Sequence, residues 1–153
     1  MALIIPTPSP SQNTYSPYYV YPSESLATVL VTPLLSGENY YHWARPMIMS
    51  LSSKNKIPFI DGSIQMPPRS DPIYPAWKRA NNIVISWITR SVSPSISQSI
   101  LWIDNAHEVW EELGEIFSQG NLIRIAELQE SIANLRQGGL YVNNYFTELN
   151  FVG

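Results

Sequence analysis

The sequence contains no cysteine, which excludes disulfide bonds, thiolate metal sites and a cysteine nucleophile. Charged residues are scarce, at 14% of the chain against about 25% in a typical domain. No apolar stretch approaches the roughly 20 residues that span a bilayer, and the first residues lack the basic and apolar regions of a signal peptide. We therefore expect a cytoplasmic protein without membrane contact. Its surface must depend on uncharged polar side chains or on partners that cover it.

Aromatic residues are abundant instead. The chain has five tryptophans and nine tyrosines in 153 residues, a length that fits one domain. Such a load first suggests a binding surface. Four of the tryptophans fall at helical spacing among aliphatic residues, which favours a packing role: Trp43, Trp77, Trp87 and Trp110. Trp102 follows a short predicted helix and is the least certain core residue.

The N-terminal region differs from the rest of the chain. Residues 1–17 contain four prolines and many small polar residues, so we predict a disordered tail. Residues 18–35 carry tyrosines and a β-branched run that stops at Pro33. This segment is predicted to be extended, either as a short strand or as an arm that lies on the helices.

A first helix is predicted behind Asn39, a plausible N-cap. The apolar residues between Tyr40 and Leu51 form one helical stripe, but Pro46 lies inside it. Either the helix kinks at Pro46, or it begins near Arg45 with the proline in its first turn. Residues 54–70 then form a connection that contains a tight turn.

The remaining pattern predicts further helices, which we expect to pack as a compact bundle of about six in an all-α fold. Asp71-Pro72 opens a long helix to about Arg90, Ser93-Pro94 opens a short one, and Asn105 with Glu108 forms a capping box. We expect that third helix to end at Gly120 and another to run from Leu122 to Gly138-Gly139. Val142 begins a last one. The predicted domain covers residues 18–153.

Residues with catalytic chemistry are few. His42 and His107 fall in different helices without a carboxylate cluster, so a structural role is favoured over a metal site. Asp61-Gly62-Ser63 is better explained as a turn than as part of a protease site, because a helical chain lacks the β-rich scaffold and second carboxylate. We expect no enzyme activity, no metal, no cofactor and no small-molecule substrate.

Charge is unevenly distributed along the chain. Residues 39–90 hold seven basic and two acidic residues, whereas residues 104–153 hold two basic and eight acidic ones. The simpler interpretation is two solvated faces of one domain. The alternative is a polar molecule suited to head-to-tail association. Basic residues near aromatic ones are candidates for contact with RNA or a partner: Arg45, Lys54, Lys56, Lys78 and Arg79.

Several strings together resemble the N-terminal Gag region of plant copia-type LTR retrotransposons. In the first half of the chain they are Tyr18-Tyr19-Val20, the run from Thr28 to Tyr40, Trp43, Met47, Leu51, Ser53-Lys54-Asn55-Lys56 and the run from Phe59 to Ile64. The likeness continues through Trp77, Trp87-Ile88, Ser93-Pro94, the run from Val109 to Leu113, the run from Phe117 to Asn121, and Tyr145-Phe146. The chain departs from that pattern at Tyr21, Pro46, Pro58 and Pro75.

The resemblance implies a helical capsid-type segment that self-associates. Since the chain ends inside what resembles the middle of Gag, we expect a truncated or degenerate copy. The alternatives are a nucleic-acid-binding adaptor that uses the basic first half, and a remnant that does not fold stably. The expected core residues are Trp43, Met47, Leu51, Trp77, Val84, Trp87, Trp110, Leu113, Phe117, Leu128 and Ile132.

Overall fold

The structure, a computed structural model, describes residues 9–138, with only the backbone for residues 119–129 and 135–138. These residues form four α-helices and one 3-10 helix: α1 (Tyr40–Ser53), η1 (Ile57–Phe59), α2 (Tyr74–Arg90), α3 (Pro94–Ile100) and α4 (Ala106–Gly138). The predicted all-α fold is confirmed. The helix expected from Val142 and the first eight residues of the predicted tail lie outside the described residues, and residues 9–17 form hydrogen-bonded turns.

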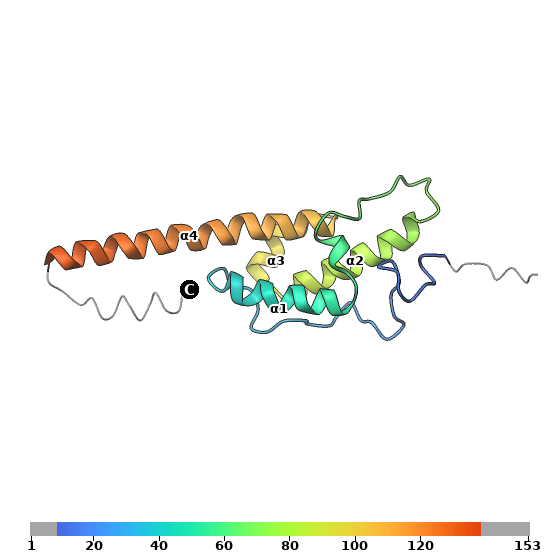
Figure 1. Ribbon diagram of the computed structural model, residues 1–153, viewed down its shortest axis with the longest axis horizontal. Helices are drawn as coiled ribbons and strands as arrows, with labels where there is room; N and C mark the ends of the chain where they lie inside the picture. Colours follow the sequence, from blue (N-terminus) through green and yellow to red (C-terminus); the bar gives the residue numbers. More distant parts are fainter. Residues whose placement is uncertain (1–8, 139–153) are drawn as a thin grey trace, which may run out of the picture.

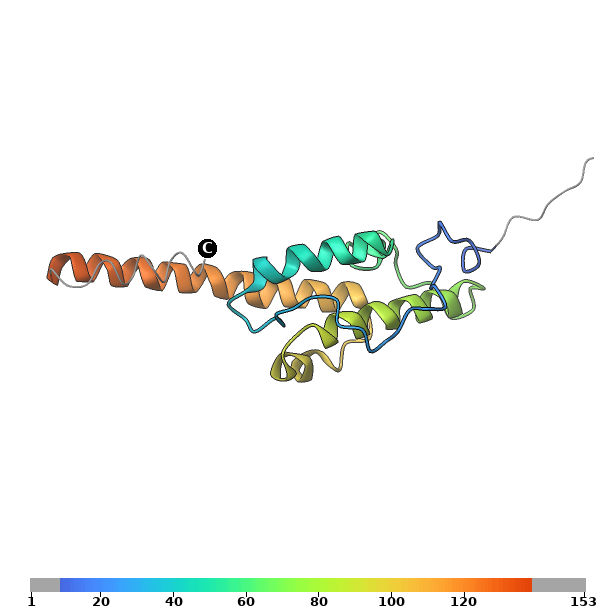
Figure 2. The same cartoon turned by 90° about the horizontal axis from the view of Figure 1, so that it is seen from below.

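The helices form a small bundle with one long extension. In Figures 1 and 2, α1, α2 and the first part of α4 pack together, and α3 lies on the side of the bundle away from α1. The rest of α4 extends well beyond the other helices, so the molecule is less compact than a closed bundle. The segment before α1 runs along the outside of the helices as an arm.

One predicted boundary is wrong, because α4 runs without interruption through Gly120 to Gly138. A glycine inside a helix costs about 1 kcal/mol relative to alanine, but it keeps its backbone hydrogen bonds. No proline lies between Ala106 and Gly138 to break the helix. The two helices expected on either side of Gly120 are therefore one.

Prolines bear on the predicted starts of α1 and α2. α1 begins at Tyr40 and contains Pro46 in its interior, so the alternative start near Arg45 is wrong. Pro46 is exposed, and the hydrogen bond it removes falls on the solvent side of the helix. α2 begins at Tyr74 instead of Pro72, because Pro75 fits the first turn, where its missing N–H needs no partner.

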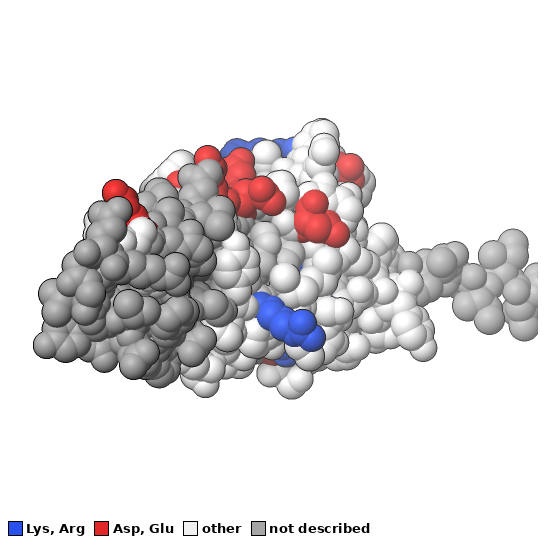
Figure 3. Space-filling model, turned by 60° about the vertical axis from the view of Figure 1, so that its left-hand side comes forward, with Lys and Arg blue, Asp and Glu red and all other residues white. Residues whose placement is uncertain are grey.

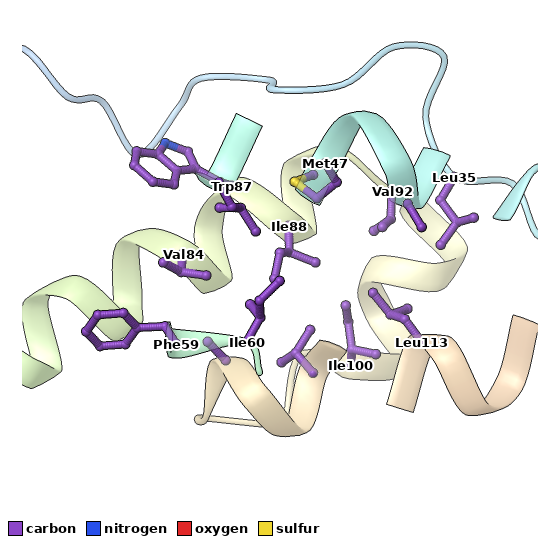
Figure 4. Packing of buried hydrophobic residues seen from close by; sticks show 14 of the residues in the cluster. Leu35, Met47, Phe59, Ile60, Val84, Trp87, Ile88, Val92, Ile100 and Leu113 are labelled. Atoms are coloured by element: carbon purple, nitrogen blue, oxygen red, sulfur yellow. The ribbon is translucent and has the colours of Figure 1, made fainter. Parts of the chain in front are cut away.

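The core joins all the helices to the arm (Figure 4). Trp43 of α1 stacks on Trp110 of α4 with 5.7 Å between ring centroids. Gly114 lets the two helices approach, since a Cβ atom there would lie 3.0 Å from the Tyr40 hydroxyl. Of the expected core residues, seven are buried in this cluster, namely Trp43, Met47, Leu51, Trp77, Val84, Trp87 and Leu113.

The other expected core residues occupy different places. Trp110 and Phe117 pack against the edge of the cluster, and Ile132 is buried farther along α4. The side chain of Leu128 lies outside the described part of the chain.

Asn81, a buried polar residue of α2, fixes where α4 begins. Its Nδ2 donates to the Asp104 carbonyl at 2.8 Å, and its Oδ1 accepts from the Ala106 amide at 2.8 Å. Asn105 Oδ1 accepts from the next two amides of the helix, so the predicted cap is present. Together these bonds satisfy N–H groups that a helix start leaves without partners.

Replacing Asn81 should therefore destabilise the fold. We expect Asn81→Ala to lower the free energy of unfolding by about 2–4 kcal/mol, since it leaves the buried Ala106 N–H and the partly buried Asp104 carbonyl without their partner. Urea denaturation would measure the change. Asn82→Ala is the matched control because Asn82 is the exposed neighbour on α2. Equal losses from the two variants would contradict the assigned role of Asn81.

Pro46 should cost stability. We expect Pro46→Ala to raise the free energy of unfolding by about 1–3 kcal/mol, because it restores one hydrogen bond of α1 and removes a clash with the preceding turn. Pro75→Ala is the control and should change little, as Pro75 lies in the first turn of α2. Thermal unfolding of both variants is the measurement. A destabilised Pro46→Ala would show that the chain depends on the proline.

Candidate assembly surfaces

The arm is held on α2 by a series of hydrogen bonds. Trp87 Nε1 donates to the Ser25 carbonyl at 2.9 Å, and Ser86 Oγ donates to the Leu26 carbonyl at 2.6 Å. Farther along, Leu35 pairs with Val92 in a single parallel bridge. Of the two predicted alternatives for residues 18–35, the arm on the helices is therefore correct and the strand is not.

Ser91, directly after α2, collects bonds from three segments. Its carbonyl oxygen accepts from the Leu35 amide at 3.0 Å and from Trp43 Nε1 at 2.7 Å. Its hydroxyl donates to the Trp87 carbonyl at 2.9 Å and accepts from the Leu30 amide at 3.3 Å. The residue is fully buried. The arm, α1 and α2 thus meet at one serine.

Two of the five candidate contact residues are engaged inside the fold. Lys56 is buried, and its Nζ donates to the Tyr19 carbonyl at 2.7 Å and to the Lys54 carbonyl at 3.1 Å. Lys54 forms an ion pair with Glu24 at 3.1 Å and lies 5.0 Å from the centroid of the Trp87 ring. Both lysines therefore hold the arm.

Burial affects the chemistry of Lys56. Desolvation lowers the pKa of its ammonium group, Glu24 opposes this shift and Lys54 adds to it.

The other three candidate contact residues, Arg45 on α1 with Lys78 and Arg79 on α2, are exposed. Since they lie on two different helices, the predicted basic surface is smaller than the sequence suggested.

The turn after η1 is a structural element. Asp61 Oδ1 accepts from the amide and the hydroxyl of Ser63, and these bonds lower the pKa of the Asp61 carboxyl. Gly62 has φ +85°, and a Cβ there would lie 3.1 Å from the His107 ring. His107 Nδ1 is hydrogen-bonded to the Ile60 carbonyl at 2.7 Å. The turn needs glycine at position 62 because of its positive φ and because the His107 ring leaves little room for a side chain. Through His107 the turn packs on α4.

No catalytic constellation forms around that turn. A hollow of about 240 Å³ lies beside it, lined by Gly62, Ile64, Gln65, Met66, Asn105 and His107. His42 lies on α1, away from this hollow in the sequence and exposed. Within residues that the structure describes, no group of three His, Asp or Glu side chains could hold a metal ion.

Exposed apolar side chains gather at two places that the sequence patterns did not single out. The first, which we call the α1 groove, is a hollow of about 540 Å³ lined by Tyr40, Tyr41, Ala44, Arg45, Ile48 and Met49. The second, the Trp102 knob, consists of Leu101 and Trp102 in the connection after α3. These side chains are 70% and 76% exposed. Exposed apolar clusters of this kind mark interaction sites.

Acidic side chains border the α1 groove. A neighbouring hollow of about 480 Å³ shares Tyr40 with it and is lined by Glu111 and Glu115 of α4. Figure 3 shows acidic side chains gathered in the upper part of one face of the molecule and a basic group below them. The groove therefore combines an apolar floor, one arginine and an acidic border.

Part of the chain is similar to copia-type Gag polypeptides of LTR retrotransposons. Residues 21–68, which include the arm, α1 and the turn with Gly62, match the family described as "Gag-polypeptide of LTR copia-type". The resemblance seen in the sequence is thereby confirmed. No helix among the described residues is long and apolar enough to cross a membrane.

Two curated relatives come from Arabidopsis thaliana. The chain is 24% identical over 124 residues to the "Retrovirus-related Pol polyprotein from transposon RE1", covering 75% of the chain and 8% of that protein. It is 26% identical over 104 residues to the corresponding polyprotein from transposon RE2, covering 62% of the chain and 7% of that protein. The chain thus spans less than a tenth of these relatives. No solved structure matches it significantly.

The stability contribution of Lys56 should depend on pH. Because its pKa lies below the ordinary 10.5, the unfolded chain binds the proton more tightly, and stability should rise as pH increases towards that value. We expect wild type to gain stability relative to Lys56→Met as the pH rises towards the ordinary lysine pKa of 10.5. The difference between the two proteins cancels the opposing effect of Tyr18 and Tyr40, whose pKa values are raised by burial.

Urea denaturation across that pH range would measure this difference. Lys78→Met, which removes an exposed lysine of α2, shows the effect of losing a positive charge alone. A difference between wild type and Lys56→Met that stays constant with pH would contradict the assignment.

Proposed function

We propose that this chain is a structural Gag module that self-associates as capsid-type proteins do, and that it has no catalytic role. The observation that carries the proposal is the presence of two exposed apolar surfaces on a fold that already has a buried core of its own. Tyr41, Ile48 and Met49 of the α1 groove are 54%, 43% and 62% exposed. Together with the Trp102 knob, they leave apolar area that association would remove from water.

The family supports this proposal. The matched segment is the Gag part of a polyprotein, and it includes α1, on which the groove lies. The chain has few charges, at 14% of its residues, which leaves fewer groups to oppose close contact between copies. The acidic border and Arg45 of the groove add the charge contrast that orients such contacts.

The alternative of an RNA-binding adaptor has weaker support. Phosphate binding requires several accessible basic groups, and each contact adds to the salt dependence of affinity. Lys54 and Lys56 are engaged with the arm, which leaves Arg45, Lys78 and Arg79 of the original candidates. The net charge of −3 also opposes nonspecific binding to nucleic acid.

Sedimentation velocity of the full chain over a wide concentration range would test the proposal. We expect the weight-average mass to rise with protein concentration, and to do so after nuclease treatment, so that RNA does not mediate the association. A chain that stays monomeric at all concentrations, at both low and high salt, would overturn self-association. Salt-dependent binding of a short single-stranded RNA by such a monomer would favour the adaptor instead.

A further inference from the structure

We infer that the α1 groove of one copy receives the Trp102 knob of a second copy, in a head-to-tail contact that repeats from molecule to molecule. This inference rests on the proposed self-association and adds the two surfaces that meet. The groove lies on α1, and the knob lies in the connection after α3. Figure 2 shows α1 and α3 on opposite sides of the bundle, so each copy presents one surface to each neighbour.

The knob is suited to burial in an apolar site. An indole ring supplies a large contact area, but its N–H must find a partner when water is removed. Trp102 Nε1 already donates to the Ser99 carbonyl of the preceding helix at 2.9 Å. The exposed ring can therefore enter a groove without leaving a buried donor unsatisfied. Leu101 beside it is 70% exposed and adds aliphatic surface.

The lining of the groove suits an apolar occupant such as the knob. The groove's volume of about 540 Å³ is lined by Tyr41, Ala44 and Ile48, with the adaptable side chain of Met49. Arg45, which is exposed at the groove, can stack on an indole face.

The charges of Arg45 and Asp104 favour a second copy of this chain as the occupant of the groove. Asp104, two residues after Trp102, has an exposed side chain, and it is the acidic group nearest to the knob in the sequence. A knob that enters the groove brings this carboxylate towards Arg45. A second copy of this chain therefore supplies an apolar group for the groove and a carboxylate for Arg45.

The two surfaces differ from each other, so their contact is heterologous. Such a contact leaves one groove and one knob free at the two ends of an open chain of copies. It produces a ring if the rotation between copies closes and a filament if it does not. A tryptophan at the centre of the contact would carry much of the binding energy.

The test uses two variants of the full chain, one for each surface. Trp102→Ala removes the knob, and Ile48→Lys places a charge in the groove. Tyr15→Ala and Leu26→Lys are the matched controls, because they change exposed residues of the N-terminal region outside both surfaces. We expect each surface variant to raise the concentration at which mass increases by about tenfold or more, and each control to behave like wild type.

Mixing the two surface variants is the decisive measurement. The intact groove of Trp102→Ala and the intact knob of Ile48→Lys should form a 1:1 dimer that grows no further, because each partner then lacks its second surface. Circular dichroism melts would verify that both variants remain folded. The double variant Arg45→Glu/Asp104→Lys should associate better than either single charge reversal, since the reversed pair attracts again.

The outcomes separate this inference from the proposed function. If wild type associates and both surface variants associate equally well, the knob-in-groove contact is wrong while self-association stands. If each variant is monomeric but their mixture forms no dimer, the surfaces do not meet each other. A monomeric wild type overturns both proposals.

Discussion

The carbonyl oxygen of Ser91 accepts the Leu35 amide and the Trp43 indole N–H at the point where α2 ends. The last carbonyl groups of a helix have no partner inside it, and here such a group is fully buried. Leaving it unsatisfied would cost about 1–3 kcal/mol. Supplying both donors fixes the end of the arm and the beginning of α1 against α2. Trp43 is thereby oriented towards α4, where it stacks on Trp110. The positions of the remaining elements follow from that arrangement.

Buried polar residues repeat this role elsewhere. Lys56 ties the connection after α1 to Tyr19 of the arm, and Asn81 ties α2 to the start of α4. Each of these residues joins segments that are far apart in the sequence. Apolar contacts tolerate small shifts along a helix, whereas a buried hydrogen bond is satisfied in only one arrangement. The apolar core supplies most of the favourable free energy, and the three polar residues determine which packing of that core is adopted.

The sequence predicted the parts of the fold that local rules control. The apolar stripes located α1, α2 and α3, and the Asn105 cap located the start of α4. Two local signals were weaker than the rules assume: Gly120 does not end α4, and Pro46 is tolerated inside α1 because its missing bond faces solvent. The lysines were misleading because their outcome depended on distant segments. Their basic character suggested a nucleic-acid surface, but Glu24 and the Tyr19 carbonyl, which no helical pattern connects to them, engage them in the arm.

The exposed surfaces depend on the buried polar residues. The Asp104 carbonyl accepts from Asn81, and the Ala106 amide donates to it, so the connection that carries Trp102 is held on both sides of Asn105. On the other side of the bundle, the bond from Trp43 to Ser91 fixes the helix that carries Arg45 and Ile48. A contact between rigid surfaces loses less conformational freedom than one between mobile segments, and more of its gross interaction energy remains as affinity. An assembly protein makes the same contact many times, so a fixed geometry at each surface also keeps successive copies in register. The polar residues that specify the fold of one copy would in this way also specify the geometry of the assembly.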